Sequence, residues 1–341
     1  MNLFEPWILL RLVAAFVTAV LFLRALIPAV KVLRHYDLHA ATEGQLALER
    51  QLLLSTTLLR IALLLQVVGV VVAVLSAEKL APQIRGAMCG YGVFASNAWG
   101  FPSLFVSSGL ALVSGVAAQL MSFDATQKRT QFVRAMSWLM IGLAPLSVLD
   151  AALAFQFARK LDLTVIASCC SVELDAGGAA ATEPLAASGS RNLLSFGPPV
   201  LMVLALALAV VAWRRPGAKN AAAAGVVSLV ALPISVGYAV LEVAPHVFET
   251  PTHVCPFCLL KADVYGIGYP LFGSLYFAFV WSMGAWLSTA LSKRSDSPTE
   301  ALGLARRLFR GESIAWAIAL LTSLWPTVRY AWVTGGLSLW H

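Results

Sequence analysis

The chain has 341 residues, of which 59% are hydrophobic and only 12% are charged. Its mean hydropathy of +0.80 is far above what a water-soluble domain needs to cover its surface. The composition therefore excludes an ordinary soluble protein and predicts an all-α, polytopic integral membrane protein, because helices satisfy their own backbone hydrogen bonds in lipid.

Membrane spans are predicted from apolar windows bounded by charged or turn residues. A helix needs about 20 mostly apolar residues to cross the hydrocarbon core of a bilayer. Eight windows meet this requirement, at about residues 7–30, 52–76, 101–123, 136–157, 193–213, 221–243, 259–291 and 313–333. The seventh window is too long for one straight span. Gly266, Gly268 and Pro270 interrupt it, so we expect the seventh span to begin near Pro270.

The distribution of Lys and Arg predicts the orientation of the spans. These residues concentrate in alternate connections, at about 31–60, 128–134, 214–219 and 293–310. Positively charged connections are retained in the cytoplasm. With eight spans, both termini are then expected to be non-cytoplasmic. The net charge of +7 is explained by this topology and by contact with the lipid bilayer, so we expect no nucleic-acid partner.

All five cysteines fall in the connections predicted to be external. We expect a single transmembrane domain over residues 1–341, with external loops at 77–100, 158–192 and 242–269. The cysteines in these loops are Cys89, Cys169, Cys170, Cys255 and Cys258. If they share an oxidising compartment, they are candidates for disulfide formation, thiol exchange or metal binding.

The strongest local motif is His253-Val254-Cys255-Pro256-Phe257-Cys258, followed by Leu259-Leu260-Lys261. Pro at a first helical position marks a helix start, so we expect Cys255 at the N-cap and Cys258 in the first turn. The helix N-terminus and Lys261 would then stabilise a thiolate. This spacing suits a redox-active dithiol, and it also suits a structural disulfide or a metal clip.

The succession Cys255-Pro-Phe-Cys258-Leu-Leu-Lys261, followed by Tyr269-Pro270-Leu271 at the start of an apolar span, resembles that of the bacterial disulfide-bond formation membrane proteins. Its CPxCL core is also similar to bacterial vitamin K epoxide reductase homologues. Those families are quinone-linked thiol oxidases built on four-helix bundles. The resemblance implies a thiol-disulfide oxidoreductase of the bacterial inner (cytoplasmic) membrane, with Cys255 and Cys258 as its dithiol and a quinone as electron acceptor. Eight spans depart from the pattern of those families.

Enzymes of this kind need a second pair of cysteines that passes oxidation to a soluble protein. The loop 158–192 offers Cys169 and Cys170, followed by a Gly- and Ala-rich stretch that reads as flexible. We expect this pair to exchange with a periplasmic thioredoxin-like protein. Vicinal thiols also suit soft metal ions such as Cu(I) or Hg(II).

Two alternatives to a redox enzyme stay open. His246, His253, Cys255 and Cys258 supply nitrogen and sulfur ligands for copper or zinc. They would suit a subunit that transports or delivers copper, zinc or mercury, in association with other membrane subunits. The chain could also be a structural subunit of a membrane complex, whose cysteines only join loops.

Charged residues within predicted spans are costly in lipid unless they are paired. Asp150 in the fourth span is the clearest case, and Arg11 in the first span is placed at a similar depth. We therefore expect Arg11 and Asp150 to form an ion pair, which serves either the structure or a proton relay.

Overall fold

The computed structural model describes residues 5–35, 43–127, 132–163, 188–337 and 339–340. In these ranges the regular structure is helical throughout and includes no strand. Seven of the described helices are long and apolar enough to cross a membrane. The prediction of an all-α, multi-pass membrane protein is therefore confirmed.

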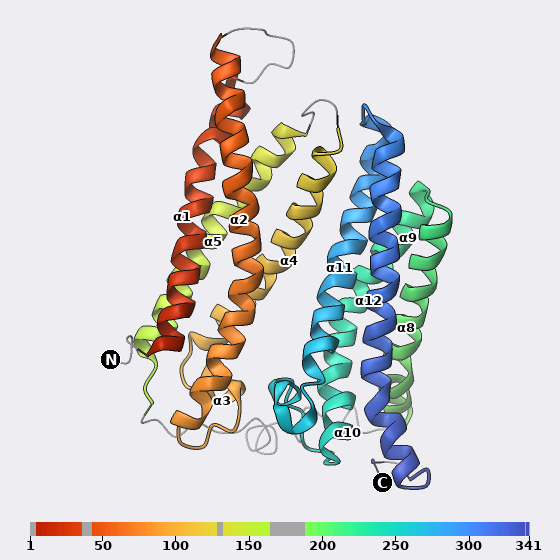
Figure 1. Ribbon diagram of the computed structural model, residues 1–341. Helices are drawn as coiled ribbons and strands as arrows, with labels where there is room; N and C mark the ends of the chain where they lie inside the picture. Colours follow the sequence, from red (N-terminus) through yellow and green to blue (C-terminus); the bar gives the residue numbers. More distant parts are fainter. Residues whose placement is uncertain (1–4, 36–42, 128–131, 164–187, 338, 341) are drawn as a thin grey trace. The chain divides into compact units, whose positions relative to one another are not determined.

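Contacts between residues divide the chain into two compact units, which we describe one at a time (Figure 1). Unit 1 comprises Met1–Ala167 and Arg294–Ala301, and unit 2 comprises Ser168–Lys293 and Leu302–His341. The single transmembrane domain expected from the sequence stays a prediction.

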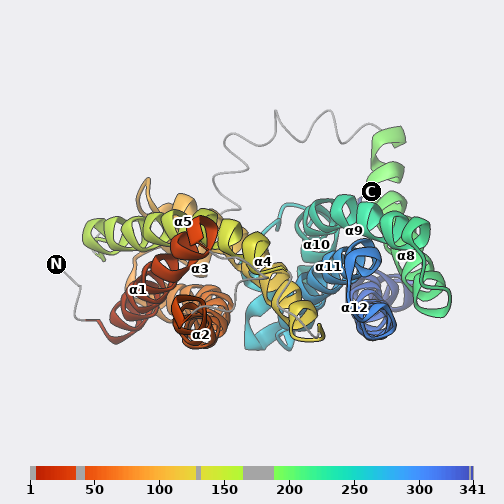
Figure 2. The ribbon, with the colours of Figure 1, turned by 90° about the horizontal axis from the view of Figure 1, so that it is seen from above.

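Unit 1 is a bundle of four long helices. They are α1 (Pro6–His35), α2 (Glu43–Leu80), α4 (Gly100–Asp124) and α5 (Val133–Lys160). Helix α1 packs against α2 and α5, and α4 packs against the same two helices, so the four form a closed ring when viewed along their length (Figure 2). The connection 81–99 contains a short turn, η1 (Ala81–Gln83), and a short helix, α3 (Gly90–Ala95).

Unit 2 is also built on four long helices. Its elements are α8 (Ser188–Arg214), α9 (Ala218–Tyr238), a π-helical turn η3 (Ala239–Val243), α10 (Ala244–Phe248), the 3-10 turns η4 (Phe257–Leu260) and η5 (Ala262–Val264), α11 (Gly268–Leu291), the 3-10 turn η6 (Ser292–Arg294) and α12 (Pro298–Val333). Helix α9 packs between α8 and α11. Helix α12 joins them through the Trp316 indole N–H, which donates to Ser228 of α9, and through Ser323, whose hydroxyl lies 3.6 Å from the Met202 sulfur of α8.

Small residues allow the helices of unit 2 to approach closely, as is usual where lipid removes the hydrophobic drive for association. A Cβ atom at Gly225 of α9 would lie 2.4 Å from the Trp286 ring of α11. A Cβ atom at Gly311 of α12 would lie 2.8 Å from the Trp281 ring of the same helix α11. Two tryptophan rings of α11 therefore occupy space that only glycine leaves open.

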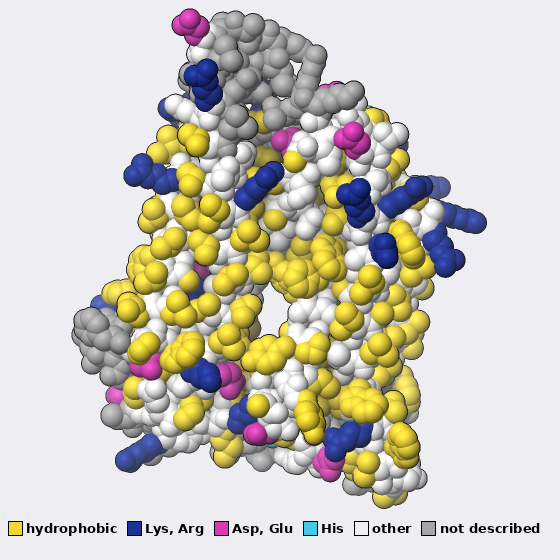
Figure 3. Space-filling model, in the orientation of Figure 1, with side chains coloured by type: hydrophobic (Ala, Val, Ile, Leu, Met, Phe, Trp, Pro, Cys, Tyr) yellow, Lys and Arg dark blue, Asp and Glu magenta, His cyan; other side chains and the backbone are white. Residues whose placement is uncertain are grey.

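The outer faces of the long helices are apolar. Large hydrophobic side chains of α1, such as Val13, Phe16 and Val20, are about half exposed, which suits contact with lipid rather than water. Figure 3 shows hydrophobic side chains dominating the middle zone of the visible face, with Lys and Arg lying mainly towards the helix ends. This distribution fits a bilayer environment.

Two boundaries at the C-terminal end differ in how they match the sequence predictions. Helix α11 begins at Gly268, so Pro270 lies in its first turn, as expected for the seventh span. Helix α12 begins at Pro298, so the helix of the eighth predicted span starts 15 residues earlier than the predicted span does. The eighth predicted span is the C-terminal part of α12, which is not among the seven helices that qualify as spans.

The two units repeat one order of elements. In each, two long helices are followed by a cysteine-containing connection, at 81–99 and 249–267, and then by two further long helices. The third long helix opens with Gly100-Phe101-Pro102 in unit 1 and with Gly268-Tyr269-Pro270 in unit 2. The Cys255–Cys258 motif therefore occupies a position in unit 2 that corresponds to the position of Cys89 in unit 1.

Candidate dithiol site

The Cys255–Cys258 motif forms a tight turn just before α11. The turn η4 has Pro256 at its N-cap position, with φ −67° and ψ −30°, and Cys258 is its second residue. Cys255 precedes the cap. The sequence predicted a helix capped by Cys255, and this detail was wrong, because the helical segment is a single 3-10 turn that starts one residue later. One such turn lacks the summed dipole of a long helix.

The two sulfur atoms lie close together in a buried position. The Sγ atoms of Cys255 and Cys258 are within 4.8 Å of each other, and both residues are present as thiols. Their exposed fractions are 0% and 2%. A disulfide needs a separation of about 2.05 Å, so the two sulfurs would have to move towards each other to form one.

Packing against α10 and α11 holds the turn in place. Leu259 is fully buried in a cluster with Val243, Ala244 and Leu271. A Cβ atom at Gly268, the first residue of α11, would lie 3.0 Å from the carbonyl group of Leu259. The backbone of the motif therefore rests directly on the start of α11, with little room for a side chain at residue 268.

Lys261 follows the turn directly. Its backbone is extended, with φ −71° and ψ 149°, and its N–H donates to the carbonyl of Cys258 at 3.2 Å. Its carbonyl accepts the N–H of Gly266 at 3.0 Å, at a glycine whose φ of +59° disfavours other residues. Lys261 thus closes the loop that returns the chain to α11. Its proposed effect on the thiols stays a prediction.

The two histidines near the motif each pack against aromatic rings. The His253 ring stacks on Phe248 with centroids 4.0 Å apart. His246 is buried, with its ring edge-on to Tyr330 and Trp340. Within the described ranges, neither histidine forms a group of potential metal-ligand atoms with the two sulfurs. The structure therefore brings Cys255 and Cys258 together and places His246 and His253 in aromatic surroundings.

Glu242 and His246 form a second polar group in unit 2, on the π-helical turn and α10. Pro245 has no N–H to donate, so the regular hydrogen-bond ladder cannot continue through it and the helix widens locally. The His246 Nδ1–H donates to the carbonyl of Glu242 at 2.7 Å, because a carbonyl can only accept. The Glu242 carboxylate accepts from Ser195 Oγ at 2.9 Å and from Trp340 Nε1 at 3.3 Å.

The remaining cysteines are placed as follows. Cys169 and Cys170 lie outside the described residues. Cys89 is a buried thiol at the N-cap position of α3, and its backbone is extended. The next N–H, that of Gly90, donates to the Glu78 carboxylate at 2.8 Å, so a side chain from the end of α2 caps this short helix.

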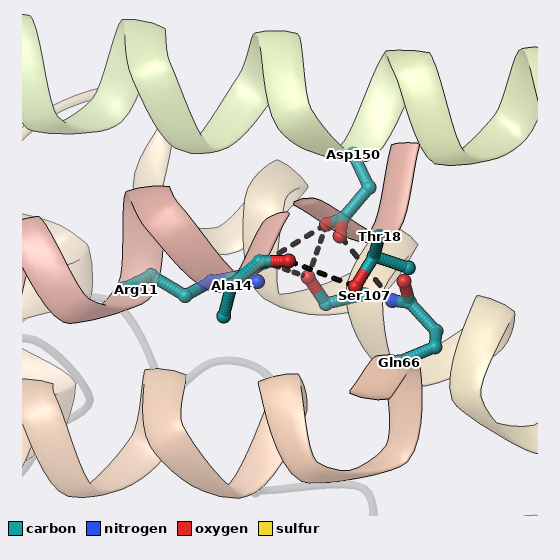
Figure 4. A network of polar contacts seen from close by, with 6 residues as sticks. All are labelled: Arg11, Ala14, Thr18, Gln66, Ser107 and Asp150. Atoms are coloured by element: carbon teal, nitrogen blue, oxygen red, sulfur yellow. Dashed lines mark hydrogen bonds and ion pairs between the residues drawn. The ribbon is translucent and has the colours of Figure 1, made fainter. Parts of the chain in front are cut away.

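Unit 1 contains the ion pair expected from the sequence, within a larger network (Figure 4). Arg11 Nη2 donates to Asp150 Oδ1 at 2.9 Å, and Gln66 Nε2 donates to Asp150 Oδ2 at 3.2 Å. Ser107 hydrogen-bonds to both Arg11 and Asp150. One polar side chain from each of α1, α2, α4 and α5 therefore meets in the interior of the bundle. A cavity of about 30 Å³ beside Arg11 has room for water.

Sequence reasoning missed Glu312, which is fully buried in unit 2. It falls just before the eighth predicted span, in a stretch where three arginines precede it closely. The signal that could have identified it is helical spacing, since the residues three and four positions away on either side, Leu308, Phe309, Ala315 and Trp316, are all apolar.

Together, the helices and the buried thiols describe a multi-pass α-helical membrane protein with a cysteine pair at the start of a span. No protein-family model, curated protein or solved structure matches the chain.

Proposed function

We propose that the chain is a membrane thiol-disulfide oxidoreductase whose active dithiol is Cys255 and Cys258. The observation that carries this proposal is the pair of buried sulfurs within 4.8 Å of each other, on a turn that packs against the first residue of the membrane helix α11. A dithiol at this place is suited to a lipid-soluble oxidant. Oxidation of the two thiols forms one disulfide bond and releases two electrons and two protons, which a quinone takes up to become a quinol.

Because the sulfurs of Cys255 and Cys258 are buried, we expect this dithiol not to exchange directly with soluble proteins. A thiol must be accessible to exchange with a protein partner. We therefore assign that exchange to Cys169 and Cys170, with a periplasmic thioredoxin-like protein as partner, in the inner membrane of a bacterium. Lys261 is proposed to assist as the cation nearest to Cys258 in the sequence.

The proposal is tested by following the redox state of the cysteines in the purified full chain. The protein is treated with dithiothreitol or with a water-soluble ubiquinone analogue, denatured in acid, and alkylated with a mass-tagged maleimide. We expect quinone to protect two thiols in the native sequence and in the double variant Cys169→Ser/Cys170→Ser. Protection should be lost in Cys255→Ser and in Cys258→Ser.

The double variant Cys169→Ser/Cys170→Ser also separates oxidation of Cys255 and Cys258 by quinone from exchange with the soluble partner. It should retain quinone-dependent oxidation of Cys255 and Cys258 and lose oxidation of a reduced thioredoxin-like substrate. The proposal fails if the alkylation of Cys255 and Cys258 is the same after reductant and after quinone.

A soft-metal site is the second candidate, and the same sulfur separation supports it. Two thiolates within 4.8 Å can bind Cu(I) in a two-coordinate arrangement or form half of a zinc site. Metal analysis of the protein after copper or zinc loading and dialysis tests this reading. Stoichiometric metal that is lost in Cys255→Ser would favour a metal-delivery subunit. Since His246 and His253 pack among aromatic rings, His246→Ala and His253→Ala should leave the metal content unchanged.

A further inference from the structure

Unit 2 buries a carboxyl group that the proposed dithiol chemistry does not use. Glu312 of α12 has an exposed fraction of 0%. Its Oε1 accepts a hydrogen bond from Ser228 Oγ of α9 at 2.8 Å. The indole N–H of Trp316, one turn further along α12, donates to the same serine oxygen at 3.2 Å. The side chains of Ser228 and Trp316, from two helices, thus fix one side of the Glu312 carboxyl group.

The other side of the carboxyl group faces Ser282 of α11. Glu312 Oε2 and Ser282 Oγ are both fully buried, and neither makes a hydrogen bond of normal geometry within the described residues. Two buried oxygens without a shared hydrogen would each lose the hydrogen bonds that water supplies in the unfolded chain, at a cost of about 1–3 kcal/mol per group. The hydrogen between them is supplied either by the Ser282 hydroxyl, which can donate to an ionised carboxylate, or by a protonated carboxyl group.

The surroundings of Glu312 supply no positive charge. The three basic residues nearest to it on α12, Arg306, Arg307 and Arg310, are exposed. In the described parts of the chain, Glu312 takes part in no ion pair, whereas Asp150 of unit 1 is paired with Arg11. From α9 and α11 the groups that reach the carboxyl are the hydroxyls of Ser228 and Ser282. An ionised carboxylate in such a place would be costly, since burial in an apolar interior penalises the charged form.

We propose that Glu312 carries a proton and that, with Ser228 and Ser282, it forms a proton-binding site inside unit 2. A proton on Oε2 makes that atom a donor, and the hydroxyl of Ser282 can accept it. One proton then removes the buried charge and satisfies both oxygens, while Oε1 continues to accept from Ser228. Because the ligand is a proton and not an electron carrier, this site is independent of the thiol chemistry proposed above.

Infrared difference spectroscopy of the full chain in lipid nanodiscs tests the site directly. A protonated carboxylic acid has a C=O stretching band that is absent from a carboxylate and shifts in deuterated buffer. We expect this band in the native protein at neutral pH, and we expect Glu312→Gln to abolish it. Asp150→Asn should leave it unchanged, because the Asp150 carboxylate is paired with Arg11. Ser282→Ala should shift the band, because it removes the acceptor of the proposed hydrogen bond.

Folding of the variants is checked by thermal unfolding in the same nanodiscs. Glu312→Gln should unfold close to the native temperature, because a carboxamide is neutral and can donate to Ser282 in the same place. If Glu312→Gln does not fold, the band shift in Ser282→Ala still tests whether a protonated Glu312 donates to Ser282. The proposal is overturned if the native protein lacks the band at neutral pH, if Glu312→Gln retains it, or if sodium ions displace it.

Discussion

The guanidinium group of Arg11 lies 2.9 Å from the carboxylate of Asp150 inside unit 1, although the two residues belong to the first and the last long helix of that bundle. Replacing Asp150 by Asn would leave the Arg11 charge buried without its counter-charge. Breaking a buried pair in this way typically costs about 3–5 kcal/mol. We therefore predict that Asp150→Asn lowers the stability of the detergent-solubilised protein by this order, measured as the free energy of unfolding in denaturant.

The matched control for this prediction is Asp263→Asn, which changes an exposed carboxylate in unit 2 and should alter stability very little. The double variant Arg11→Met/Asp150→Leu removes both charges together and should recover most of the loss. A double variant less stable than Asp150→Asn alone would contradict the view that an unpaired charge causes the destabilisation.

The membrane helices were predictable because a bilayer imposes a simple requirement on length and polarity. Gly266 and Pro270 also predicted where α11 starts, since their effect on the backbone is local. The burial of Glu312 was not predictable, because it is set by tertiary packing and not by a local effect. The burial of Glu312 depends on packing against α9 and α11. The exposed arginines beside it in the sequence dominate the mean hydropathy of any window that contains it.

The candidate site was predicted in part. The cysteine spacing correctly indicated a turn that brings Cys255 and Cys258 together, because four consecutive residues can form such a turn by local geometry alone. The length and cap of that turn depend on Leu259 and on Gly268, which is distant enough in the chain to act by packing. The positions of the histidines depend on the π-helical segment before Pro245. A hydropathy pattern does not reveal such a segment.

Gly268 is predicted to control the position of the dithiol turn. An added methyl group would lie 3.0 Å from the carbonyl of Leu259, so Gly268→Ala should push the turn away from α11. Such overpacking commonly costs about 1–3 kcal/mol. We expect Cys258 to become more exposed and to react faster with a maleimide under native conditions. Gly273→Ala, on the same helix with open space around its Cβ position, should react at the native rate. Equal rates for the two variants would disprove the contact.

Two glycines of α12 are predicted to respond in opposite directions to the same substitution. At Gly311 a methyl group would meet the Trp281 ring at 2.8 Å, so Gly311→Ala should destabilise unit 2 by about 1–3 kcal/mol. At Gly303 nothing lies within 4 Å, so Gly303→Ala should be neutral or stabilise the helix by about 0.5–1 kcal/mol. Thermal unfolding of both variants in one detergent provides the measurement. A stabilising Gly311→Ala would show that Trp281 is not held against α12.

The predicted orientation places the cysteine motif on the non-cytoplasmic side of the membrane, and the proposed function depends on it. Lys219, in the first turn of α9, and Glu249, just after α10, are both exposed and lie at opposite ends of the same predicted span. In a cysteine-free background we predict that Glu249→Cys reacts with a membrane-impermeant maleimide added to intact cells. Lys219→Cys should react only after the membrane is made permeable. The reverse pattern would place Cys255 and Cys258 in the reducing cytoplasm, where a disulfide-forming role is disfavoured.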